Sequence, residues 1–90
     1  KMTAIITVVG IDKIGITAGI SNVLAEAEVN ILDLNQNILQ DYFTMMMLVD
    51  LSAANVSMKT LKEQLDLKGQ ELGVSVRLQH EDIFRSMHRI

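Results

Sequence analysis

The sequence contains no cysteine, no proline and no tryptophan, and its aromatic residues are one tyrosine and two phenylalanines. A chain without cysteine cannot form disulfides, thiolate nucleophiles or sulfur-ligated metal sites, and this composition fits the reducing cytoplasm, where we expect the protein to lie. Binding of RNA to a sheet requires aromatic rings at the middle of strands, and Tyr42 and Phe43 are the only adjacent pair. The shortage of aromatic rings therefore argues against an RNA-binding sheet.

Positive charge is scarce in the first part of the chain. Between residues 1 and 55 two lysines oppose six acidic residues, and the net charge of the whole chain is -3. The three arginines, Arg77, Arg85 and Arg89, all lie in the last fourteen residues. This distribution cannot build the basic stripe that nucleic-acid phosphates require, so we expect no nucleic-acid partner.

Long hydrophobic runs are also absent, although 49% of the residues are hydrophobic. The apolar opening, residues 2–9, is too short to span a bilayer as a helix and lacks the cleavage pattern of a signal peptide. We therefore expect a soluble protein with no membrane partner. Ninety residues supply one core and no Gly-, Ser- or Pro-rich linker divides them, so the sequence predicts one domain.

Four segments have the composition of strands. Thr3 to Val9 is short and rich in β-branched residues. Asn30 to Gln40 alternates apolar with polar positions, which predicts one dry and one wet face. Tyr42 to Leu51 is apolar on both faces around three consecutive methionines, which we interpret as core residues rather than as an adaptable binding surface. Val74 to Gln79 alternates again and predicts the last strand.

The first helix is predicted to begin inside the stretch GIDKIGI, residues 10–16. From Ile16 to Ala27 apolar or small residues recur at the i, i+3, i+4 spacing of a helix that buries one stripe. The carboxylate of Asp12 is expected to cap this helix. Gly19 lies within the helix at a cost of about 1 kcal/mol relative to Ala, which predicts that another segment approaches it closely.

Two further helices are predicted in the second half of the chain. The second is expected to start at a Ser57 cap and to stop near Gly69 or Gly73. Its apolar stripe consists of Met58, Leu61, Leu65 and Leu72. The tail, residues 81–90, is predicted to form a short amphipathic third helix with Ile83, Phe84, Met87 and Ile90 on one face.

The order of these elements predicts an α+β fold, a ferredoxin-like βαββαβ sandwich with a C-terminal helix added. Right-handed crossovers place two helices on one face of a four-stranded antiparallel sheet and leave the other face bare. An uncovered apolar face favours association, so we expect either the tail helix or a second subunit to cover it.

No residue pattern supports an enzyme. Phosphate chemistry on this fold would need an arginine near the first loop, and none precedes Arg77. A Ser-His-acid site would need a histidine, and His80 and His88 lie in or beside the tail with no evident serine partner. The two acids that follow His80 match no zinc-ligand spacing together with these histidines. We predict a protein with no catalytic residues, no metal and no cofactor.

The stretch GIDKIGI suits neither a strand nor a helix interior, and two interpretations of it remain open. It can be a strand-to-helix turn with a cap. Alternatively, the helix start presents free backbone N–H groups to a small anion such as an amino-acid carboxylate, because Gly15 has no side chain to block the approach.

The chain resembles ACT domains, regulatory modules of metabolic enzymes that bind amino acids. The resemblance rests on Gly10, Asp12, Lys13, Gly15 and Ile16, followed by Asn30 and Ile31, and spans Met2 to about His80. The segments YFTMMM and IFRSMHRI are similar to those of the small stand-alone ACT-domain proteins of bacteria and archaea. We therefore assign residues 1–80 to an ACT domain and residues 81–90 to a C-terminal amphipathic helix of the same domain.

The resemblance implies an effector site at the interface between two copies of the domain. The loop after the first strand of one copy would contribute Asp12, Gly15 and Ile16. The start of the second strand of the other copy would contribute Asn30 and Ile31. The expected partners are thus a small-molecule effector, an amino acid, and further copies of the chain in a dimer or larger homo-oligomer.

Two functions from different classes are compatible with the sequence. In one, the protein is a regulatory sensor that binds an amino acid at a subunit interface and passes its occupancy to a partner. In the other, it is a non-enzymatic protein-protein interaction module with no small-molecule ligand, and GIDKIGI is only a structural cap. Gly10 stands where serine-binding ACT domains have a histidine, so the resemblance does not imply serine as the effector.

Overall fold

The computed structural model describes residues 2–11 and 14–87. In chain order the elements are β1 (Thr3–Ile11), α1 (Ile16–Glu26), β2 (Asn30–Leu39), β3 (Tyr42–Asp50), α2 (Met58–Leu72), β4 (Val74–His80) and α3 (Glu81–Met87). This is the predicted βαββαβ order with one helix added. The last three residues of the predicted tail helix lie outside the described residues.

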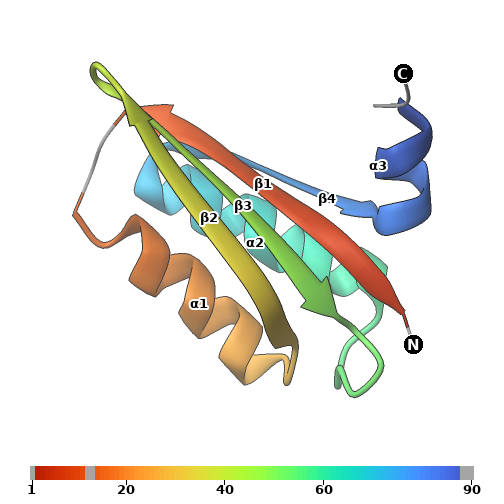
Figure 1. Cartoon of the computed structure of the whole chain (residues 1–90). Helices are drawn as coiled ribbons and strands as arrows, with labels where there is room; N and C mark the ends of the chain where they lie inside the picture. Colours follow the sequence, from red (N-terminus) through yellow and green to blue (C-terminus); the bar gives the residue numbers. More distant parts are fainter. Residues whose placement is uncertain (1, 12–13, 88–90) are drawn as a thin grey trace.

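The four strands form one antiparallel sheet in the order β2-β3-β1-β4. Both α1 and α2 lie on the same side of this sheet, as the sequence predicted, and α3 stands beyond the end of β4 (Figure 1). β1 and β3 are the central strands, whereas β2 and β4 each have one free edge. None of the described helices is long and apolar enough to cross a membrane.

The core lies between the sheet and the two helices. Alternate residues of β1 and β3 point into it, and the buried set from these strands is Ala4, Ile6, Val8, Phe43, Met45, Met47 and Val49. The interpretation of the methionines as core residues is confirmed for two of the three. Met46 points to the opposite side of the sheet, which we call the open face, and is 40% exposed.

The start of α1 follows from the backbone of one glycine. The helix begins at Ile16, inside the predicted stretch, and Gly15 occupies the N-cap position in the left-handed conformation. Asp12, which the sequence predicted as the cap, lies outside the described residues. The close approach predicted at Gly19 is confirmed, because a Cβ there would lie 2.9 Å from Cδ1 of Leu72 on α2. A side chain at position 19 would require the end of the Leu72 side chain to move.

The ends of α2 agree with their sequence signals. The Ser57 hydroxyl accepts a hydrogen bond from the backbone N–H of Thr60 at 3.1 Å, which satisfies one of the free amides of the first turn. Of the two glycines predicted as stops, Gly73 ends the helix with φ 73°, and Gly69 lies buried within it. Leu61 and Leu65 are buried beneath the helix.

The prediction that the second strand has one buried face is wrong. All ten residues of β2 are exposed in the single chain. β2 is an edge strand with one neighbour, and α1 contacts it only sparsely. A bulge between Ile31 and Asp33 also shifts the register, so that Leu32 does not continue the alternation that the sequence suggested.

The tail helix does not cover the open face. α3 contacts β1 and β4 only, and none of its described residues is buried. The sequence allowed either the tail helix or a second subunit to cover this face, and α3 protects one end of it at most. Most of the open face is solvent-exposed in the single chain.

Because Met46 and Met47 lie on opposite faces of β3, their replacement should change the stability by different amounts. Met47→Ala should lower the free energy of unfolding by about 2–5 kcal/mol, because it leaves a cavity in the core. Met46→Ala, the matched control, should change it by less than about 1 kcal/mol, because Met46 is partly in solvent already. Urea denaturation measures both, and equal losses would contradict the assignment of the two faces.

Candidate functional site

The candidate site begins where β1 leaves the sheet. Gly10 is paired with Phe43 on one side and with Val74 on the other. A Cβ at Gly10 would overlap the side chain of Val74, so a larger residue would push β1 and β4 apart. Glycine at this position thus allows β1 and β4 to pair closely near the end of β1, before the chain turns toward α1.

Gly15 is required for its backbone conformation rather than for space. Its φ is 91° and its ψ is 0°, a region that residues with a Cβ rarely adopt. Apart from its chain neighbours, no atom of residues 2–11 or 14–87 lies within 4 Å of the position that a Cβ would take, so these residues leave the surroundings of Gly15 open. The carbonyl oxygen of Gly15 accepts the first helical hydrogen bond, from the N–H of Gly19 at 2.8 Å.

The amides that open α1 precede that first hydrogen bond. The N–H groups of Ile16, Thr17 and Ala18 have no acceptor further back in the helix, and no capping side chain is supplied by Gly15. The side chain of Ile16 is buried in the core and cannot contact a ligand. Of the residues assigned here, Gly15 and Ile16 could therefore contribute only backbone groups to a site, and these suit an anion.

Asn30 and Ile31 lie at the start of β2, beyond the other end of α1. Both residues are exposed. The eleven residues of α1 separate them from Gly15 by about 16 Å along the helix axis. A single chain consequently does not bring the two predicted sets of residues together.

Two polar residues that the sequence did not reveal connect α1 to β2. The Gln36 side-chain amide donates to the Thr17 hydroxyl at 3.2 Å, and that hydroxyl lies 3.8 Å from the sulfur of Met45. These contacts tie the first turn of α1 to the middle of β2. Residues 17 and 36 are nineteen positions apart, and no local pattern could have paired them.

Four of the surface hollows formed by the described residues do not coincide with the predicted site. Their volumes are about 220 to 440 Å³, and none of the four is lined by Gly15, Ile16, Asn30 or Ile31. Within residues 2–11 and 14–87, no group of three or more metal-ligating side chains is close enough to hold an ion.

The conformation of Gly15 predicts a graded cost for its replacement. Gly15→Ala should lower the free energy of unfolding by about 1–2 kcal/mol, because a Cβ disfavours the left-handed region. Gly15→Asn should cost less, since asparagine tolerates that region better, although the open surroundings admit either side chain. Thermal or urea denaturation compares them, and an alanine variant as stable as the wild type would contradict the observed backbone.

Known proteins with this sequence pattern and fold are numerous. An ACT domain model matches residues 2–79. A UPF0237 protein of Clostridium acetobutylicum is 57% identical over 99% of this chain and 100% of its own length, and one of Methanopyrus kandleri is 56% identical over 97% of each. The solved ACT domain protein from Streptococcus pneumoniae is 44% identical, with a TM-score of 0.81 over 92% of this chain and 93% of that chain. This chain therefore belongs to the ACT domain family, among relatives that carry the UPF0237 name in bacteria and archaea.

Proposed function

We propose that this chain is a non-catalytic cytoplasmic regulator that self-associates along β2 and binds an amino acid at the resulting interface. ACT domains are regulatory and often bind amino acids, and the chain belongs to that family. The observation that carries the proposal is the exposed edge of β2, which begins at Asn30 and ends beside the last residue of β1, Ile11, from which the chain leads to Gly15. The UPF0237 relatives carry no enzyme name, which supports a non-enzymatic function.

The composition of β2 favours pairing with another strand. Ile31, Leu32, Leu34, Ile38 and Leu39 are all exposed on this one strand. Edge strands that remain single usually carry lysine or proline, which prevent pairing, and β2 has neither. A second copy that pairs with this edge would remove these side chains from water and satisfy the free backbone groups of the edge.

The topology of the sheet determines which residues such a pair brings together. Leu39 is paired with Tyr42, which is paired with Ile11, so β2 ends where the loop toward Gly15 begins. Asn30 lies at the opposite end of β2, opposite Asp50. Two β2 strands paired antiparallel about a two-fold axis would place Asn30 of one copy at the Leu39 end of the other.

This arrangement assigns a role to each predicted residue. The backbone groups of Gly15 and Ile16, at the start of α1, would bind the carboxylate of the amino acid. The side chain of Asn30 from the second copy can donate and accept, so it would contact the carboxylate or the ammonium group. Ile31 would bound the pocket, and Asp12 would offer its carboxylate to the ammonium group.

Binding of an amino acid should be visible in melting experiments. At 100 times its dissociation constant, one of the twenty free amino acids should stabilise the protein by about 2.7 kcal/mol. Asn30→Ala should weaken that binding about tenfold or more, because it removes a hydrogen bond to a charged group. Gln64→Ala removes an exposed amide from α2 and serves as the control, with unchanged affinity by calorimetry.

The β2 interface should be sensitive to charge. Ile38 is 57% exposed, so Ile38→Lys should leave the fold of the single chain intact while it opposes edge pairing. We expect this variant to have half the wild-type mass in sedimentation equilibrium and to lose the response to the amino acid. Leu67→Lys on α2, where Leu67 is 64% exposed, is the matched control and should keep the wild-type mass.

The interaction module without a ligand remains the second candidate function. It is favoured by the four surface hollows described above, none of which is lined by Gly15, Ile16, Asn30 or Ile31. A wild-type chain that dimerises through β2, yet melts at the same temperature with every amino acid, would select this alternative.

A further inference from the structure

The open face of the sheet and α3 enclose a hollow of about 330 Å³ that is separate from the predicted effector site. Its floor includes Val9 on β1 and Met46 on β3, and Met87 on α3 contributes to its wall. These three side chains are 43%, 40% and 55% exposed. The hollow thus presents apolar surface to water that no described part of the chain covers.

The wall of the hollow is held in place at both ends of α3. The Thr3 hydroxyl on β1 donates to the carboxylate of Glu81 in the first turn. In the last turn, the Met87 sulfur lies 4.0 Å from the side-chain nitrogen of Gln79 on β4. These contacts lie between α3 and the ends of β1 and β4, so the helix is attached beside the sheet rather than over it.

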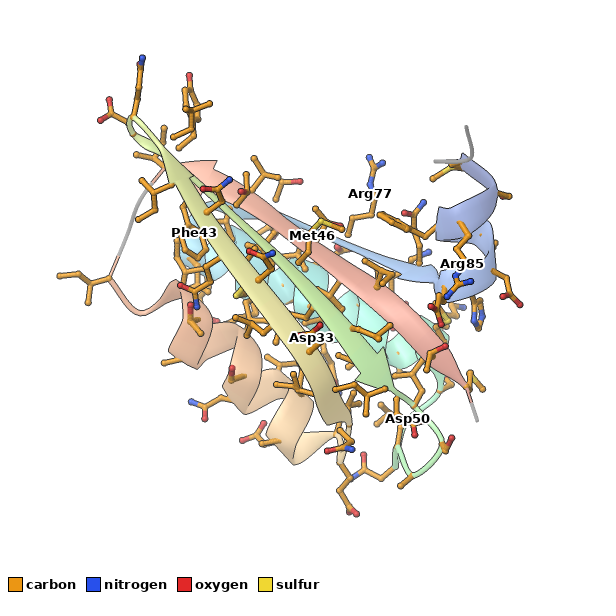
Figure 2. The ribbon with its side chains drawn as sticks, in the orientation of Figure 1. Asp33, Phe43, Met46, Asp50, Arg77 and Arg85 are labelled. Atoms are coloured by element: carbon orange, nitrogen blue, oxygen red, sulfur yellow. The ribbon has the colours of Figure 1, made fainter. Side chains whose placement is uncertain are left out.

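The described side chains that line the hollow carry one positive charge. Arg77 lines it from β4, together with neutral polar side chains such as Thr7 and Gln79, and none of the described residues that line it is acidic. No ion pair or hydrogen bond of the Arg77 side chain is present among residues 2–11 and 14–87. Figure 2 shows the guanidinium of Arg77 extending away from the ribbon, with Met46 on the neighbouring part of the sheet.

Arg85, the other arginine that the structure describes, differs from Arg77 in having a partner. The Arg85 guanidinium forms two hydrogen bonds with the Glu81 carboxylate, at 2.9 and 3.3 Å, within α3. Arg85 is thus already paired, while Arg77 keeps its planar set of donors available. A guanidinium of this kind prefers a carboxylate, which it can bind through two parallel hydrogen bonds.

We propose that this hollow binds an amphipathic monocarboxylate, a molecule with one carboxylate and an unbranched apolar chain. The carboxylate pairs with Arg77, and the chain lies over Val9 and Met46 against Met87. One cation at the polar side of the hollow, beside Thr7, Ser75 and Gln79, and apolar side chains on the rest of its lining suit one negative charge joined to an apolar body. The volume lies within the range of small-molecule sites. The hollow shares no residue with the predicted effector site, so this inference does not rest on the proposed function.

Titration calorimetry with octanoate, below the concentration at which it forms micelles, tests the proposal. We expect one octanoate per chain and weaker binding of hexanoate, because a shorter chain buries less apolar surface. Arg77→Gln should raise the dissociation constant at least tenfold, while Lys62→Gln, which removes the same charge from α2, should change it less than twofold. Octan-1-ol, which lacks the carboxylate, should bind at least tenfold more weakly than octanoate.

Further variants separate this site from the effector site and from other occupants of the open face. Asn30→Ala should bind octanoate like the wild type, and Arg77→Gln should keep the response to the amino acid. The proposal is overturned if octanoate fails to bind at millimolar concentration, if Arg77→Gln binds it equally well, or if octan-1-ol binds as tightly. It is also overturned if the Met46→Lys variant has half the wild-type mass in sedimentation equilibrium, because a second copy would then occupy this face in the wild-type protein.

Discussion

The packing of two helices against one face of the sheet is the constraint on which the rest of the structure depends. α1 and α2 approach each other so closely at Gly19 and Leu72 that a Cβ at position 19 would have to displace the leucine. This contact holds both helices beneath the same face, where the inward side chains of β1 and β3 are fully buried. Almost all the apolar burial of this small domain is thereby concentrated on one side of the sheet.

One-sided burial leaves two apolar surfaces outside the core. The first is the edge strand β2, which keeps Ile38 and its apolar neighbours exposed. The second is the open face, where Met46 meets the hollow beside α3. The two surfaces differ in what they can bind. β2 offers a row of free backbone groups, which suits another strand, whereas the hollow offers Arg77, which suits a small anion.

Most of the fold could be predicted from the sequence because the local signals agree with one another. The Ser57 cap, the leucine spacing after it and Gly73 together define α2, and the structure confirms both ends. The order of the strands and helices along the chain was predictable for the same reason. The burial of Met45 and Met47 was predictable too, whereas the core role expected for Met46 was wrong. The dry face of β2 was not, since alternation shows which residues share a face but not whether anything packs against it. The bulge at Ile31 and Asp33 left no sequence signal either.

The candidate site, like the fold, could be predicted from the sequence only in part. The sequence by itself determined that the first helix starts inside GIDKIGI, and the glycine at position 15 meets a local demand, because its φ is 91°. Only the tertiary structure decided that Asn30 lies beyond the far end of α1, that Gln36 contacts Thr17 and that Arg77 lines a partly apolar hollow with no ion-pair partner among the described residues. These relations join segments that are distant in sequence, and they depend on the order in which the strands pair, which side-chain periodicity does not encode.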